Sequence, residues 1–355
     1  MRKIDVSLLF SVIIITLFGL FMIYDASSFV AFRDFADKYH YIKSQFAWII
    51  FGFAALAFFS YFDYHKLYNL ALPVLSGALV LLILVFIPGV GVSLLGAHRW
   101  INVRFSLLQP AEFVKLALAI YLAAWFSNKE KGRLAAFLLL MGLVLGLVML
   151  EPDMGTTAVI LAEALIIYFL SGANVLYFSL LVPVLGFLGF LFIKFSPYRA
   201  KRLESFLNIN SSLDNSSYHV KQILIALGVG GLTGVGLGNS LQKYAYLPET
   251  ATDSIFAIIA EELGFIGAVA LIIFFIFIVF RCFRIAVNAR DNFGKLLAGG
   301  ITTFLAVQTI INLAAQTALL PLTGIPLPFI SYGGSALVID LAAIGIILNI
   351  SKQIL

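Results

Sequence analysis

Long apolar runs without charges, separated by short polar segments, make up most of the chain. Each run is close to the ~20 residues that an α-helix needs to cross a bilayer. Nine further runs follow the first, which is long and bulky, so we interpret it as a membrane anchor rather than a cleaved signal peptide. The pattern predicts an all-α polytopic integral membrane protein with about ten transmembrane helices, at residues 8–24, 46–61, 68–87, 113–126, 134–150, 155–170, 175–193, 255–280, 296–315 and 335–350.

Composition supports a membrane protein and excludes other classes. Of the 355 residues, 62% are hydrophobic and 12% are charged, whereas soluble domains carry roughly 25% charged residues. A soluble enzyme, a disordered chain and a disulfide scaffold are therefore excluded. The single cysteine, Cys282, rules out an intramolecular disulfide and a cysteine metal cluster, and the four histidines show no ligand spacing. The net charge of +5 suits lipid headgroups or an anionic ligand, and its scatter along the chain disfavours nucleic acid.

The distribution of Lys and Arg predicts the orientation in the membrane. Loops on the side of the termini contain eleven of these residues, and the opposite short loops contain six. The long segment 194–254 is left out of the count because long loops translocate regardless of charge. We therefore expect a single membrane domain, 1–355, in the cytoplasmic membrane. Both termini would be cytoplasmic, and 194–254 would form a large extracytoplasmic loop between helices seven and eight.

Several charged residues then lie near the outer membrane surface. Glu112 and Lys115, spaced i, i+3 after Pro110, share one helical face. They either form a salt bridge at the membrane edge or mark a functional site, where Lys115 and Arg99 would offer cations to a phosphate. Asp153 follows a chain break and either caps the next helix or serves as a ligand or a partner of Lys115.

The long segment contains the other candidates. Apolar residues spaced i, i+3, i+4 and i+7 over 220–227 predict a short interfacial helix. Six glycines follow in 228–239, and we expect a pliant loop that approaches a lipid-borne ligand, with simple packing as the alternative. Asp253, close to Glu249, either belongs to a helix N-cap or acts on a sugar hydroxyl or a divalent cation. Glu261 and Glu262 lie deeper and need partners.

Taken together, these segments resemble the SEDS family (shape, elongation, division and sporulation) of peptidoglycan glycosyltransferases. The matching segments are 96–101 with 109–115, 151–156, 234–264 and 320–335. Residues 198–203, 236–240 and 246–249 look more like the FtsW division branch than the RodA elongation branch. The last matching segment contains few ionisable groups, so we expect it to be a structural wall.

The resemblance implies polymerisation of lipid II at the outer leaflet. The 4-hydroxyl of an acceptor GlcNAc would attack the anomeric carbon of a donor MurNAc and expel undecaprenyl pyrophosphate with inversion. Asp253 matches the family's essential acid and would be a general base or a ligand of Mg²⁺ or Mn²⁺, with no organic cofactor. Supporting residues would be Arg99, Glu112, Lys115, Asp153, Arg199, Lys201, Arg202, Glu249, Glu261 and Glu262.

The resemblance also implies partners. A class B penicillin-binding transpeptidase is expected because this chain has no soluble domain for cross-linking, and an FtsW-like protein would meet other divisome membrane proteins. One departure concerns Ala251-Thr252-Asp253-Ser254, where family members usually have His-Thr-Asp-Phe. Histidine at that place is either dispensable here or replaced from elsewhere. The rival functions are a lipid II flippase or transporter and a non-catalytic divisome scaffold.

Overall fold

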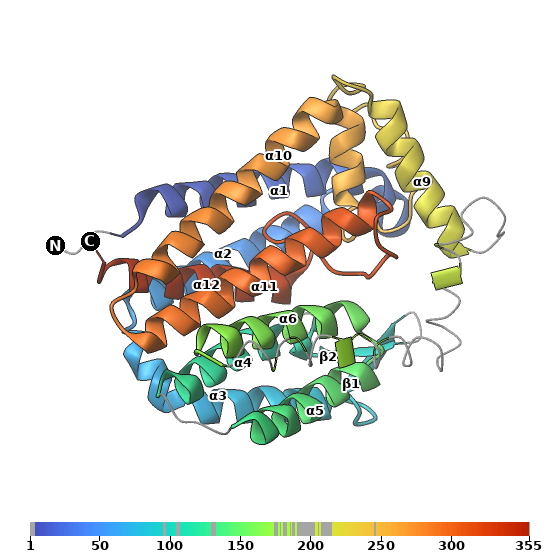
Figure 1. Ribbon diagram of the computed structural model, residues 1–355. Coiled ribbons are helices and arrows are strands. Elements are labelled where there is room, and N and C mark those ends of the chain that lie inside the picture. Colours follow the sequence, from blue (N-terminus) through green and yellow to red (C-terminus); the bar gives the residue numbers. More distant parts are fainter. Residues whose placement is uncertain are drawn as a thin grey trace.

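The computed structural model describes residues 4–94, 97–103, 107–128, 133–173, 215–244 and 246–354, with single positions between 174 and 214. In Figure 1 both termini lie at one end of the helical bundle, and the strands and α9 lie toward the other. The described elements are α1 (Val6–Phe35), α2 (His40–Tyr61), α3 (His65–Leu84), β1 (Gly91–Leu94), β2 (Ala97–Asn102), β3 (Leu107–Leu108), α4 (Pro110–Ser127), α5 (Leu134–Leu150), α6 (Met154–Leu170), α9 (Asn215–Gly230), α10 (Ile255–Asn288), α11 (Asn292–Gln316) and α12 (Gly334–Ser351).

The predicted membrane helices are confirmed wherever the structure describes them. Nine of the ten apolar runs coincide with helices, and seven of these helices are long and apolar enough to cross a membrane by length and composition. The other two, α5 and α6, are apolar helices of 17 residues. The run 175–193 lies outside the described residues except for single positions, so the total of ten stays a prediction. The interfacial helix expected around 220–227 is part of α9.

A small antiparallel sheet, which the apolar pattern did not predict, interrupts the all-α fold between α3 and α4. Its strands run in the order β1-β2-β3, with Gly91 opposite Ile101 and Ile101 opposite Leu108. This segment is too short and too polar to span the bilayer, and its backbone groups find their partners by pairing strands. After β3 the chain enters α4 at Pro110, which lies in the first turn of the helix, where proline is favoured.

The bundle is built around three buried helices. In the most apolar 18-residue window of α12, 89% of the residues are buried, and the value for α4 and α11 is 72%. The same measure is 22% for α2 and 28% for α3 and α10, so these helices present most of their surface outward, as lipid-facing helices do. Polar side chains on α4, α11 and α12 therefore lie inside the protein, where each must find a partner.

A kink divides α10 at Gly264, whose φ of 69° and ψ of −171° are not helical. The glycine-rich segment after α9 packs against this kink. Amides and carbonyls that the broken helix leaves free are bonded to that segment, through Val235 N to Glu261 O (3.0 Å), Gly236 N to Glu262 O (3.0 Å), Phe265 N to Gly231 O (2.9 Å) and Ile266 N to Leu232 O (3.1 Å). Irregular backbone at membrane depth is tolerated under this condition, because the protein itself satisfies its polar groups.

The glycines serve this close contact between backbones. A Cβ on Gly230 would lie 2.2 Å from Ala260 O, and one on Gly234, which has a φ of +80°, would lie 2.1 Å from Glu262 O. Gly230 and Gly234 therefore serve packing against α10, and the expected approach of this loop to a lipid-borne ligand stays a prediction. The packing alternative accounts for these positions.

Replacing Gly264 with alanine should destabilise the fold. An added Cβ would lie 2.2 Å from Gly234 N and would hold a side chain in a backbone conformation that favours glycine. We expect a loss of roughly 2–4 kcal/mol, measured by reversible unfolding of the purified protein in detergent. Gly77→Ala is the matched control, since an added Cβ on this α3 residue meets open space. Equal stability of the two variants would contradict this account.

Candidate functional site

Asp253 lies in a tight turn directly before α10. The turn folds over the carbonyl of Glu249, which accepts the N–H groups of Thr252 and Ser254, each at 3.2 Å. Glu249 itself has a φ of 50°, a left-handed conformation that costs a non-glycine residue energy. Its side chain is exposed, and Asp253 is half-buried. The candidate acid is thus presented at the protein surface on a turn of defined shape.

Hydrogen bonds to three successive backbone carbonyls fix this turn. Tyr332 N donates to Ala251 O (2.8 Å), Ser331 Oγ donates to Thr252 O (2.6 Å) and Asn312 Nδ2 donates to Asp253 O (3.3 Å). The donors belong to α11 and to the segment 320–335, which was expected to be a structural wall. That segment also limits the space around the acid, since a Cβ on Gly324 would lie 3.3 Å from Asp253 Oδ2.

A row of buried amides on α11 supports the same segment. Gln308 Nε2 donates to Pro326 O (3.1 Å), and Asn312 Nδ2 also donates to Ile325 O (2.7 Å). Gln316 Nε2 donates to Asn312 Oδ1 (2.7 Å) and Gln316 Oε1 accepts the N–H of Ala257 (2.9 Å). These residues were not predicted, although three amides spaced by four in an apolar run are a recognisable signal of one polar helix face.

The Glu112–Lys115 pair lies beside Gln308, the first amide of this row. Lys115 Nζ is 2.7 Å from Glu112 Oε2 and donates to Gln308 Oε1 at 2.5 Å, and both residues of the pair are 1% exposed. The predicted salt bridge is therefore confirmed. The interpretation that Lys115 offers a cation directly to a phosphate is not supported, because its ammonium group is enclosed and already neutralised by Glu112. The structure also pairs Lys115 with Glu112 and Gln308 instead of Asp153.

Two further acids lie near Lys115 and were not predicted. Glu163 on α6 and Asp340 on α12 are both fully buried, and both interact electrostatically with the Lys115 ammonium group. Among the described residues, neither carboxyl group has a hydrogen-bond partner. A buried carboxyl group without a hydrogen-bond partner is costly in an apolar bundle. The sequence did contain a signal for these two residues. Each is the single acid in its apolar run, and an acid inside a predicted membrane helix is a candidate functional residue.

Asp153 caps α6, as one of its two interpretations predicted. Its side chain accepts the N–H of Thr156 at 3.0 Å and the hydroxyl of Thr156 at 2.9 Å. It also accepts Gln109 Nε2 at 3.3 Å, and Gln109 N donates to Ser335 Oγ at 3.1 Å. The cap therefore joins the starts of α4, α6 and α12 at one end of the bundle.

Arg99 fixes the corner that precedes α6. From β2 it donates through Nε to Glu151 O at 3.1 Å and through Nη2 to Pro152 O. The Glu151 carboxyl group is fully buried, and neither of its oxygens has a hydrogen-bond partner among the described residues. Burial, reinforced by the nearby charge of Asp153 and opposed by Arg99, raises the pKa of Glu151 to about 9. This carboxyl group is therefore protonated at neutral pH.

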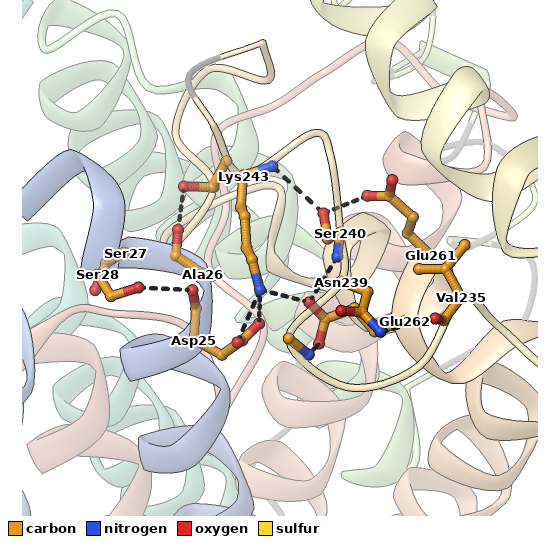
Figure 2. A network of polar contacts seen from close by, with 12 residues as sticks. Asp25, Ala26, Ser27, Ser28, Val235, Asn239, Ser240, Lys243, Glu261 and Glu262 are labelled. Carbon is orange, nitrogen blue, oxygen red and sulfur yellow. Dashed lines mark hydrogen bonds and ion pairs between the residues drawn. The ribbon is translucent and has the colours of Figure 1, made fainter.

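A second buried network ties the segment between α9 and α10 to α1 and α10 (Figure 2). Lys243 Nζ contacts both carboxylate oxygens of Asp25, at 2.9 and 3.0 Å, and Glu262 Oε1 at 2.8 Å. Burial alone would lower the pKa of Lys243, but its hydrogen bonds to Glu262 and Asp25 outweigh that effect and raise it. The lysine thus stays charged between two carboxylates.

The adjacent acids Glu261 and Glu262 also bind the loop directly. Glu262 accepts the N–H groups of Gly238 (3.1 Å) and Ser240 (3.2 Å), while Glu261 accepts the Ser240 hydroxyl and the N–H of Leu241 (3.1 Å). The prediction that these acids need partners is confirmed. Lys243 and Asp25 were not predicted as members of the site, because 218 residues separate them in the sequence.

The remaining predicted site residues, Arg199, Lys201 and Arg202, lie outside the described residues. Within the part of the chain that the structure describes, no group of three or more His, Cys, Asp or Glu residues is arranged to hold a metal ion. Asp253, the corner at Asp153 and the segment 320–335 are instead joined through α11 and the start of α12.

Comparison with known proteins identifies the fold. The family model for FtsW, RodA and SpoVE, described as cell cycle proteins, matches residues 6–354. The chain belongs to this family. The predicted SEDS resemblance is therefore confirmed over almost the whole sequence.

Sequence relatives of this SEDS protein carry the names FtsW and stage V sporulation protein E. It is 36% identical over 357 residues to a probable peptidoglycan glycosyltransferase FtsW of Geobacter sp. (strain M18), covering 98% of this chain and 97% of the relative. It is 39% identical over 355 residues to the stage V sporulation protein E of Bacillus subtilis (strain 168), with the same coverage. Relatives of both names match at similar identity, so the FtsW branch stays a prediction.

Solved structures of SEDS proteins share the fold. A chain of a peptidoglycan synthase complex, described as coordinating polymerization and crosslinking, matches with a TM-score of 0.83 at 26% identity, covering 99% of both chains. The rod shape determining protein RodA of Thermus thermophilus matches with a TM-score of 0.73 at 26% identity, covering 99% of this chain and 98% of RodA. The arrangement of helices described above is therefore that of the family.

The buried Glu151 of this SEDS protein should make stability depend on pH. Because its pKa is about 9 in the folded protein and near the usual 4.5 when unfolded, the folded state binds more protons between these values. Stability therefore falls as pH rises through that window. We expect Glu151→Gln to raise the unfolding temperature relative to wild type at about pH 8 and to change it little at about pH 4. Asp34→Asn, at an exposed carboxylate, is the control. If the unfolding temperature of Glu151→Gln differs from that of wild type by the same amount at both pH values, the prediction is wrong.

Proposed function

We propose that this chain is a peptidoglycan glycosyltransferase that polymerises lipid II at the outer face of the cytoplasmic membrane. The observation that carries the proposal is the full-length match to relatives described as probable peptidoglycan glycosyltransferases. The structure adds a candidate acid, Asp253, on a turn in which its own carbonyl and the two preceding carbonyls are fixed by hydrogen bonds. A base that must meet a hydroxyl at hydrogen-bonding distance benefits from such a rigid support.

In the proposed reaction Asp253 acts on the acceptor sugar. The 4-hydroxyl oxygen of the acceptor GlcNAc forms a bond to the anomeric carbon of the donor MurNAc while the bond to undecaprenyl pyrophosphate breaks. The hydroxyl proton passes to the Asp253 carboxylate, and the configuration at the anomeric carbon inverts. The half-buried position of Asp253 suits this role, since the carboxylate is accessible yet partly shielded from water.

A divalent cation is compatible with this site. Mg²⁺ is usually bound by one or two carboxylates together with the phosphates of the substrate, so a dedicated cage of protein ligands is not required. Asp253 would hold the ion, and the ion would supply positive charge for the departing pyrophosphate. The cation and the base are alternative roles for the same carboxylate.

Cationic side chains would share the charge of the leaving group. Lys115 is enclosed with Glu112, and Arg99 donates to two backbone carbonyls, so both serve mainly to hold the structure. We propose that Arg199, Lys201 and Arg202, which lie outside the described residues, supply positive charge to the pyrophosphate. A substrate with a charged, departing pyrophosphate needs such groups near the bond that breaks.

The proposal includes the location and the partner. The chain would lie in the cytoplasmic membrane with both termini inside, and a class B penicillin-binding transpeptidase would cross-link its product. One structural relative belongs to a complex that combines polymerization with crosslinking, which supports such a partner. Further divisome membrane proteins are expected if the role is FtsW-like.

Replacing Asp253 should abolish polymerisation without unfolding the protein. Purified protein with its transpeptidase partner is incubated with lipid II and Mg²⁺, and glycan strands are measured by gel electrophoresis. We expect Asp253→Ala and Asp253→Asn to lower the rate by at least ~100-fold, because general-base catalysis contributes about 10²–10⁴-fold. Asp37→Ala, at an exposed carboxylate, should retain the wild-type rate. Polymer from the folded Asp253→Ala variant at that rate would rule out the assignment, and lipid II transport without polymer would favour the transporter alternative.

The orientation has its own test. Cys282 is buried, so Cys282→Ser gives a background without thiols in which single cysteines are introduced. Tyr246 in the outer loop and Asn288 at the end of α10 are both exposed. A membrane-impermeant maleimide should label Tyr246→Cys in intact cells, and Asn288→Cys only after permeabilisation. The reverse pattern would overturn the proposed topology.

A further inference from the structure

Ser254 occupies the N-cap position of α10, but its side chain does not cap the helix. A serine at this position ordinarily accepts an N–H group from the first turn. Here the N–H of Ala257 is bonded to Gln316 Oε1 of α11 at 2.9 Å, in addition to Ser254 O at 3.0 Å. The amide of α11 thus takes over the capping function and leaves the Ser254 hydroxyl available for another contact.

That contact is with a histidine on a different helix. The Ser254 Oγ atom lies 2.7 Å from His219 Nε2 of α9, and Ser254 is only 1% exposed. A buried hydroxyl requires a hydrogen-bond partner, and an imidazole nitrogen can donate to it or accept from it. The hydrogen bond therefore links α9 to the residue that directly follows Asp253.

α9 is held firmly enough for His219 to act as a support. One face of the helix packs against α1 and α10 in a separate apolar cluster formed by Ala26, Ile223, Ala226, Leu247, Ala257 and Ile258. At its C-terminal end, Gly230 lies so close to α10 that an added Cβ would be 2.2 Å from Ala260 O. His219 lies one turn before the buried Ile223 and directly before the buried Val220, so this packing places it.

The turn is consequently held from two sides. The segment 320–335 and α11 bind the carbonyls of Ala251, Thr252 and Asp253, and α9 binds the hydroxyl of Ser254. Fixing the residues on both sides of Asp253 restricts the backbone angles that aim its carboxylate. A shift of about 1 Å in a catalytic group costs on the order of 100-fold in rate, so this second support matters for the reaction.

We propose that His219 is a positioning residue for Asp253, acting through the Ser254 hydroxyl. The inference rests on the proposed function of Asp253. His219 does not take part in bond making; it keeps the Asp253 carboxylate aimed at the acceptor hydroxyl. Removal of the support should therefore lower kcat and leave the binding of lipid II, measured as KM, largely unchanged.

The test compares variants that keep or remove this hydrogen bond. The terminal amide of a glutamine side chain lies about as far from the backbone as Nε2 of histidine does, so it can bond to Ser254. The side chain of alanine has no polar atom. With purified protein, its transpeptidase partner, lipid II and Mg²⁺, we expect His219→Ala to lower kcat roughly tenfold, equivalent to about 1.4 kcal/mol, with KM changed less than about twofold. His219→Gln should recover kcat to within about threefold of wild type.

Two further variants separate positioning from general damage. Ser254→Ala should lower kcat as His219→Ala does, and the double variant should be no slower than either single one, because both remove the same contact. Tyr218→Ala, at an exposed neighbouring position on α9, should keep the wild-type kcat. If His219→Ala does not fold, the comparison of His219→Gln with the shorter His219→Asn takes its place. His219→Asn should then show the tenfold lower kcat, and His219→Gln should stay within about threefold of wild type.

Results that would refute the positioning role of His219 can be distinguished from results that would refute the glycosyltransferase function. Wild-type kcat in folded His219→Ala, with Asp253→Ala inactive, would overturn the positioning role and leave the glycosyltransferase proposal intact. A raised KM with unchanged kcat would instead make His219 a substrate contact and also overturn it. Equal loss in His219→Gln and His219→Ala would show that the hydrogen bond is not what matters. Polymerisation by Asp253→Ala would refute the proposed function itself.

Discussion

A charged side chain inside an apolar bundle must find its partner within the protein, because hydrocarbon offers none. Lys243 illustrates how much of the fold depends on this constraint. Its ammonium group is placed between Asp25 of α1 and Glu262 of α10, so a lysine of the segment between α9 and α10 lies at the centre of a contact between two helices. Moving the loop away would leave two carboxylates unpaired, and the cost of an unpaired buried charge is of the order of 3–5 kcal/mol.

The same constraint makes the segment between α9 and α10 an integral part of the bundle. The kink at Gly264 frees backbone groups of α10, and the glycine-rich segment binds them. The carboxylates just before the kink bind the next part of that segment, from Gly238 to Lys243. The Asp253 turn follows directly, so its position is set by contacts made deep in the membrane domain. A reactive group supported in this way can be rigid although it lies in a connecting segment.

Local features were predictable from the sequence, and contacts between distant segments were not. Apolar runs revealed the helices, the i, i+3 spacing revealed the Glu112–Lys115 pair, and the chain break at Pro152 indicated the cap by Asp153. Nothing local connects Lys243 with Asp25, or His219 with Ser254, because these contacts depend on how the helices pack. The small sheet was missed because short strands beside long apolar runs leave a weak alternating pattern. Family resemblance, which draws on order along the whole chain, selected Asp253 where spacing alone left the cap and the acid undecided.

The buried Lys115 is connected to the Asp253 turn through side-chain amides of α11. From Lys115 a continuous set of contacts passes through Gln308 to Pro326 O, and from the neighbouring Ile325 O through Asn312 to Asp253 O. Each of these amides makes contacts in two directions, so displacement of one would leave a buried polar group unsatisfied, which costs about 1–3 kcal/mol. Loss of the Lys115 charge would also leave Glu112 enclosed without its cation, beside Glu163 and Asp340. The Glu112–Lys115 pair and the Asp253 turn are therefore connected through α11 and the segment 320–335.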